Sequence, residues 1–236
     1  MQQNQQQTTS KVTLKQAFTD PEFSRCSWVN VTNIIFHELT GINVIFLYSN
    51  TILALVLTGN SFTPRQGVYA INIVNTLASG MAVWTVRTFG RRPLLIWGHS
   101  GICVCHLMIA TFILESIDIG VLVMLCVFML IYQNTSGPIA WIYAAETLTD
   151  VGLGVSLNVL YGTILVLSLI TEPLMNSALT PVGVFYMLAF FSFVAVFFLY
   201  FYFKETMGLT EKQKKSLYSP AAVKENSQVL EAEFDN

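Results

Sequence analysis

The side chains that could do chemistry stand inside long apolar runs, where a polar group costs free energy unless it faces a protein interior or water. The densest set is the adjacent pair His37 and Glu38, followed by Asn43. Asn30 and Asn33 precede His37 at helical spacing and share its face. We expect His37, Glu38 and Asn43 to form a polar site, and Asn30 and Asn33 to bond neighbouring helices.

Uncharged amides and aromatic rings form a second set further along the chain. Asn75 stands in the second apolar run, and Gln133 stands in the fourth, a few residues before Trp141. Amides donate and accept hydrogen bonds, and aromatic faces cover the C–H surface of a sugar ring. An ion pathway would carry more carboxylates or carbonyl rings. The residue types therefore favour a neutral, polyhydroxylated solute.

Six apolar runs of about 20 residues must position these side chains, because a helix of that length spans the ~30 Å core of a bilayer. The chain of 236 residues is 53% hydrophobic and only 11% charged, which is typical of a membrane protein. The predicted spans are Trp28–Leu57, Val68–Val86, Leu94–Leu114, Ile119–Tyr143, Leu153–Met175 and Val182–Phe203. Backbone groups in lipid need internal partners, so the prediction is an all-α integral membrane bundle.

Two of the predicted spans should be broken. The first is about 30 residues long with Gly41 near its middle, which predicts a bend or unwound turn there. In the fourth, the backbone nitrogen of Pro138 cannot donate a hydrogen bond to the carbonyl of Asn134, which predicts a kink close to Gln133.

Cationic residues set the expected orientation. Arg25, Arg87, Arg91, Arg92 and the lysines after the last span fall on one side of six spans, and Arg65 alone falls on the other. Cytoplasmic loops carry the excess of Lys and Arg, so both termini are expected in the cytoplasm, with the plasma membrane as the expected location.

The ends differ in composition from the middle. We predict a cytoplasmic N-terminal segment over 1–24 with a short amphipathic helix, a six-helix transmembrane domain over 25–204, and a cytoplasmic C-terminal tail over 205–236.

Several function classes are not favoured. The four cysteines lack paired metal-ligand spacing, and we find no catalytic triad and no Gly-rich phosphate loop. The net charge of −2 does not suggest nucleic-acid binding. We expect no enzyme activity, cofactor or metal, and leave proton coupling open because His37 and Glu38 are both ionisable.

Five short motifs in register resemble the sugar porters of the major facilitator superfamily. They are His37-Glu38-Leu39-Thr40-Gly41-Ile42-Asn43, Asn75 within Ile73-Val74-Asn75-Thr76, Gly90-Arg91-Arg92, Gly137-Pro138-Ile139-Ala140-Trp141 with Ala145-Glu146, and Glu205-Thr206-Met207-Gly208-Leu209-Thr210. The resemblance runs from about Lys15 to Glu211. It implies the C-terminal six helices of a twelve-helix hexose transporter, whose sugar site lies between two rocking halves.

The resemblance also implies roles for single residues. His37 and Glu38 stand where the family has two ligand-binding glutamines, while Asn43 and Asn75 are retained. Gln133 stands where glucose facilitators often have a ligand-binding Glu, and Trp141 matches their tryptophan. Ile164-Leu165 replaces an expected Asn-Trp pair, so we expect that wall of the site to be missing.

A gating pair is implied at the cytoplasmic ends of the spans. Arg91 and Glu146 match family positions, whereas Arg87 and Leu153 replace two further expected partners. We expect the Arg91–Glu146 pair to open and close with the transport cycle.

Two alternatives to a sugar carrier remain, a non-transporting sugar sensor or assembly partner, and a proton-coupled carrier of another small solute. The partners expected are a sugar, the lipid bilayer, and a missing N-terminal half or a second copy. We expect that this chain alone does not transport, and that its length reflects a truncated gene model rather than a true half-transporter.

Overall fold

The computed structural model describes residues 12–56 and 63–220, and the regular structure of these residues is helical. The helices are α1 (Leu14–Thr19), α2 (Ser24–Leu39), α3 (Ile42–Val56), α4 (Pro64–Thr88), α5 (Arg91–Leu114), α6 (Asp118–Asn134), α7 (Ser136–Thr147), α8 (Asp150–Met175), α9 (Thr180–Tyr202) and α10 (Glu211–Lys215).

Most of the expected spans are long and apolar enough to cross a membrane. The α2–α3 pair, α5, the α6–α7 pair, α8 and α9 meet both conditions within the described residues. The sixth, α4, has 25 residues, enough for about 37 Å of helix, but polar side chains such as Asn72, Asn75 and Ser79 make it less apolar. It packs against α6 as part of the same bundle. The all-α membrane fold predicted from the sequence is therefore confirmed, with α4 as its least apolar span.

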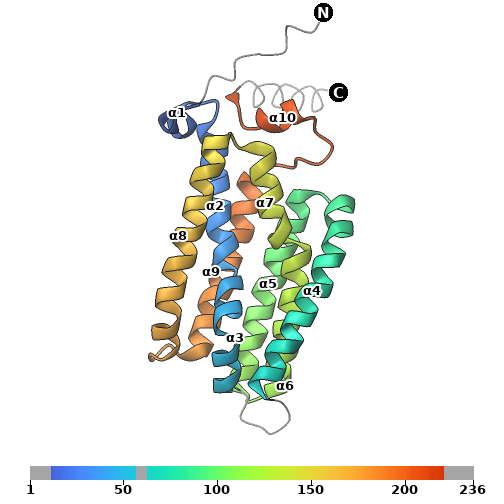
Figure 1. Cartoon of the computed structure of the whole chain (residues 1–236), viewed down its shortest axis with the longest axis vertical. Helices are drawn as coiled ribbons and strands as arrows, with labels where there is room; N and C mark the ends of the chain where they lie inside the picture. Colours follow the sequence, from blue (N-terminus) through green and yellow to red (C-terminus); the bar gives the residue numbers. More distant parts are fainter. Residues whose placement is uncertain (1–11, 57–62, 221–236) are drawn as a thin grey trace, which may run out of the picture.

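The helices stand side by side in one upright bundle (Figure 1). The short helices α1 and α10 lie at the same end, which we call the α10 end, as an even number of spans requires. In this view α8 and α4 form opposite edges, with α2 and α3 stacked end to end between them. The closest packing in the bundle joins α5 and α9.

Both predicted breaks are present. Between α2 and α3, Gly41 has φ of +81°, a left-handed conformation that glycine adopts without strain. Between α6 and α7, the chain leaves helical geometry at Thr135, three residues before Pro138. The kink therefore lies at the turn whose hydrogen bond Pro138 cannot make, as expected.

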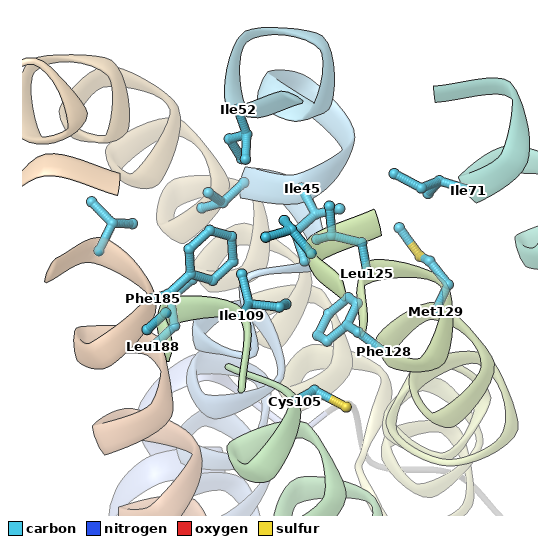
Figure 2. Close-up of a cluster of buried hydrophobic side chains, with 14 of the residues drawn as sticks. Ile45, Ile52, Ile71, Cys105, Ile109, Leu125, Phe128, Met129, Phe185 and Leu188 are labelled. Carbon is cyan, nitrogen blue, oxygen red and sulfur yellow. The ribbon is translucent and has the colours of Figure 1, made fainter. Parts of the chain in front are cut away.

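A second, smaller apolar cluster that includes Tyr143 and Tyr218 lies at the α10 end. The larger apolar core lies toward the opposite end of the bundle. It joins side chains of α3, α5, α6 and α9, among them Ile45, Ile109, Phe128 and Phe185, which meet in Figure 2. These four residues are almost fully buried, and the three from other helices pack around Ile45 near the start of α3. The core thus fixes α3, the second half of the broken first span, against three other helices.

The segment after the last span packs more closely than its charged sequence predicts. Tyr218 is buried, and its hydroxyl lies 2.8 Å from the Tyr143 hydroxyl of α7. Burial raises the pKa of Tyr218 to about 12. Lys215 donates hydrogen bonds to the carbonyls of Ala145 and Leu148 at the end of α7. Residues up to 220 therefore belong to the folded bundle, while 1–11 and 221–236 of the expected terminal segments lie outside the described residues.

Candidate functional site

A cavity of about 510 Å³ opens on one side of the bundle. Of the six predicted substrate residues, His37, Glu38, Asn43, Gln133 and Trp141 line it. They come from α2, α3, α6 and α7, and so from both sides of the two helix breaks. The breaks therefore bring together residues that straight helices would hold apart.

His37 is held by two neighbours beside the α6–α7 break. Its Nδ1 lies 3.2 Å from Ser136 Oγ, and its Nε2 lies 3.0 Å from the Tyr132 hydroxyl. The ring is almost fully buried and sits 5.5 Å from the Tyr132 ring. Both ring nitrogens are thus engaged, and His37 couples the first span to the fourth.

Glu38 is the acidic group of the cavity wall. Its carboxylate accepts a hydrogen bond from the Asn43 side chain, which reaches back across the Gly41 break. His37 Nε2 lies 3.8 Å from the other carboxylate oxygen. The break therefore pairs two of the predicted site residues directly.

Asn75 lies beside the cavity wall and contacts it through Gln133. The Gln133 Nε2 donates to Asn75 Oδ1 at 2.5 Å, joining α6 to α4. The two residues are 58 positions apart in the chain. Gln133 lines the cavity, so Asn75 is joined to the cavity wall through this bond.

The remaining wall is aromatic and apolar. Trp141 of α7 and Tyr161 of α8 are 42% and 65% exposed, although both line the cavity. Ile164 of α8, which stands where the family resemblance implies an asparagine, also lines the cavity. These exposed rings show that the cavity is one concave face rather than an enclosed chamber.

The predicted gating pair is formed at the α10 end. Arg91 Nη2 lies 3.1 Å from Glu146 Oε1, and Lys214 Nζ lies 3.0 Å from the same oxygen. Thr206 Oγ1 donates to Glu146 Oε2 at 2.7 Å. Hydrogen bonds to Glu211 and, second, to Glu146 raise the pKa of Lys214. Glu146 is therefore the acceptor at the centre of a cluster that joins α5, α7 and α10.

Glu205 is a further residue of this end, and the sequence analysis assigned it no role of its own. Its carboxylate accepts hydrogen bonds from the backbone nitrogens of Arg91 and Arg92 at 2.9 and 3.0 Å. It thereby caps the first turn of α5, where backbone donors lack helical partners and a negative charge is favoured. A side chain at Gly90 would meet the Glu205 carboxylate, which explains that glycine. In the sequence, this contact was indicated only by the fact that Gly90 and Glu205 both belong to motifs of the family resemblance.

The asparagines before His37 differ in their contacts. Asn30 donates hydrogen bonds to the Cys26 carbonyl and to Thr147 Oγ1, each at 3.0 Å. The expected bond to a neighbouring helix is therefore confirmed for Asn30. Asn33 is equally buried, and its side chain has no hydrogen-bond partner among residues 12–56 and 63–220.

Within the same ranges, the structure gathers no group of three or more His, Cys, Asp or Glu side chains that could hold a metal ion. What the site offers is hydrogen bonding from amides, a carboxylate and hydroxyls beside aromatic faces. Such a surface can bind and orient a small polar molecule.

Comparison with solved structures supports the fold. The chain is similar to a double-tryptophan variant of XylE, with a TM-score of 0.75 and 20% identity over 84% of this chain and 44% of that one. It is also similar to the D-xylose-proton symporter, with a TM-score of 0.69 and 20% identity over 78% of this chain and 44% of that one.

Curated relatives point the same way. A glucose transporter, GlcP, of Staphylococcus epidermidis is 27% identical over 80% of this chain and 44% of its own length. The facilitated glucose transporter member 3 of solute carrier family 2 in Mus musculus is 24% identical over 92% and 46%. The chain thus spans less than half of the length of these relatives.

The family model described as sugar (and other) transporter matches residues 1–218, which include both helix breaks, the cavity and the cluster at the α10 end. The chain belongs to the sugar transporter family, with the fold of half a major facilitator superfamily carrier.

Proposed function

We propose that this chain is one half of a carrier that moves a hexose-like sugar across a membrane by alternating access. The observation that carries the proposal is the cavity wall, where the hydrogen-bonding groups of Glu38, Asn43 and Gln133 line the same cavity as the exposed ring of Trp141. Sugar hydroxyls match such amides, and the ring covers the apolar face of the sugar. Relatives named as glucose and hexose transporters favour transport over a non-transporting sensor.

The proposal requires a second wall. The cavity is open on one side, and the outer face of α4 carries exposed apolar residues, including Ile73, Leu77 and Trp84. Relatives named as glucose transporters are about twice as long as the region that this chain matches, a length that leaves room for such a wall. We therefore include a complementary half as the partner of this chain, with a second copy as the alternative.

We include gating by the cluster at the α10 end. Glu146 joins Arg91 of α5 to Lys214 of the segment after the last span. The two ion pairs are only partly exposed, so breaking them as helices separate would change the balance between two conformations. We include in the proposal that both termini lie in the cytoplasm and that the carrier lies in the plasma membrane.

Uptake by cells tests the proposed function. The full-length carrier that contains this chain is expressed in cells that lack hexose uptake, and entry of labelled glucose is measured with unlabelled hexoses and with amino acids as competitors. We expect saturable uptake that hexoses compete and amino acids do not. Surface-expressed carrier without hexose uptake would contradict the proposal.

The pH dependence of uptake tests whether Glu38 takes part in proton coupling. The titratable groups that face Glu38 are His37 on its own helix and Tyr132 from α6, with His99 of α5 behind His37. A neutral carboxyl can donate a hydrogen bond to a sugar hydroxyl, whereas a carboxylate can only accept. We therefore expect uptake to fall as the pH rises, and Glu38→Gln to flatten this profile because an amide donates at every pH.

The matched control for that profile is Glu22→Gln, since Glu22 is exposed between α1 and α2, outside both the cavity and the cluster at the α10 end. It should keep the wild-type pH dependence. Superimposable profiles for wild type and Glu38→Gln would mean that Glu38 only replaces the hydrogen bonds of a glutamine.

A further inference from the structure

His106 lies on α5, outside the cavity, and makes a contact that the site described above does not explain. Its ring is fully buried between the rings of Phe128 and Phe185, with centroids 5.2 and 5.7 Å away. These two phenylalanines belong to the core shown in Figure 2. Its Nε2 lies 2.8 Å from the carbonyl oxygen of Thr40, 66 residues earlier in the chain.

Thr40 is the last residue before the Gly41 break, where α2 has ended and α3 has not begun. A helix break leaves carbonyls without the amide donors that a continuous helix would supply. In the apolar interior of a membrane protein water does not replace them, so a side chain must. Carbonyl oxygen only accepts, so His106 Nε2 carries the proton and donates it to the Thr40 carbonyl.

The break also has an apolar contact on the same side. A side chain at Gly41 would meet Leu188 of α9, so the backbone there lies directly against α9. The break is therefore contacted by Leu188 of α9 and by His106 of α5, two helices that make the most extensive helix–helix contact among the described residues. On the other side of the break, Asn43 reaches back to Glu38.

We propose that His106 is a positioning residue that holds the α2–α3 break against α5 and thereby fixes Asn43 relative to Glu38 in the cavity. It touches neither cavity nor solute, and acts through the Thr40 carbonyl. The consequence for solute binding rests on the proposed function, whereas the anchoring of the break does not.

His99 offers a matched control on the same helix. It is equally buried, but its Nδ1 bonds to the Leu95 carbonyl one turn earlier in α5 itself. His99→Leu and His106→Leu therefore remove the same ring from the same helix, and only the second removes a donor from the break. His106→Gln restores an amide donor of similar reach.

Hydrogen exchange of the purified 236-residue chain in lipid nanodiscs tests the anchoring without any solute. We expect His106→Leu to speed exchange of the peptide that spans 39–45 about tenfold, His99→Leu to leave it within about twofold, and His106→Gln to restore it. Equal exchange in the two leucine variants would overturn the proposal. If neither leucine variant folds, His106→Asn, whose amide is too short to reach, should exchange faster than His106→Gln, and equal rates would overturn the proposal.

Uptake kinetics of the full-length carrier test the positioning. We expect His106→Leu to raise the KM for hexose at least fivefold, with recovery in His106→Gln. A lower maximal rate at constant KM would mean that His106 only supports folding. Absence of uptake by the wild type would contradict the proposed function, while the exchange result would still decide the anchoring.

Discussion

Replacing Gln133 with alanine should raise the KM for hexose uptake by the full-length carrier about tenfold, with unchanged protein at the cell surface. Gln133 both lines the cavity and donates to Asn75 Oδ1. The alanine would leave a solute hydroxyl and the side-chain Oδ1 of Asn75 without a hydrogen-bond partner. An unpaired buried polar group costs about 1–3 kcal/mol, and about 1.4 kcal/mol corresponds to a factor of ten in affinity.

Replacing Asn43 or Asn75 with alanine should also raise the KM for hexose uptake, by several-fold in each case. Asn72 provides the control, because it lies one turn before Asn75 on α4 and its Nδ2 bonds to the Val68 carbonyl of its own helix. Asn72→Ala should keep the wild-type KM. Wild-type-like KM values for all three site variants would reject the polar wall as the solute site.

Replacing Gly98 with valine should destabilise the protein, with a lower unfolding temperature and a lower yield of folded chain. Gly98 of α5 is buried where that helix crosses the α6–α7 break, and a side chain there would overlap the Thr135 hydroxyl and Cβ. Thr135 is held in turn by a hydrogen bond to the Ile131 carbonyl at 2.7 Å. Overpacking of this kind typically costs about 1–3 kcal/mol, a large share of the stability of a domain.

Thermal unfolding in detergent, with the yield of monodisperse protein, measures this effect. Gly154→Val is the matched control, since a side chain at Gly154 of α8 meets nothing within 4 Å. We expect the control to unfold at the wild-type temperature. Equal behaviour of the two valine variants would show that α5 does not need close approach to the break.

The fold was largely predictable because its signals are local. Apolar run length gives the spans, Gly41 marks the first break by its conformational freedom, and Pro138 marks the second by its missing donor. Span ends differ by a few residues because capping decides them. The Thr63–Gln66 capping box with Pro64, for example, starts α4 four residues before the predicted span.

The candidate site was only partly predictable because its geometry depends on contacts between distant residues. Five of the six residues predicted to bind substrate line the cavity, whereas Asn75 is joined to it only through a bond to Gln133 that crosses 58 positions. The contact of His106 with Thr40 and the burial of Tyr218 likewise follow from how helices pack. The spacing of residues within one helix does not indicate which side chain of another helix contacts it.

Reconstitution tests most directly the claim that this chain is one half of a sugar carrier. The purified 236-residue chain is placed in liposomes alone, and the full-length carrier in a parallel set, and entry of labelled hexose is measured with the oligomeric state determined by cross-linking. Because the cavity is one open wall, we predict no saturable uptake by the monomeric chain and saturable, hexose-competed uptake by the full-length carrier. Uptake only by a cross-linked dimer would make a second copy the missing wall. Saturable uptake by a demonstrated monomer would contradict the account.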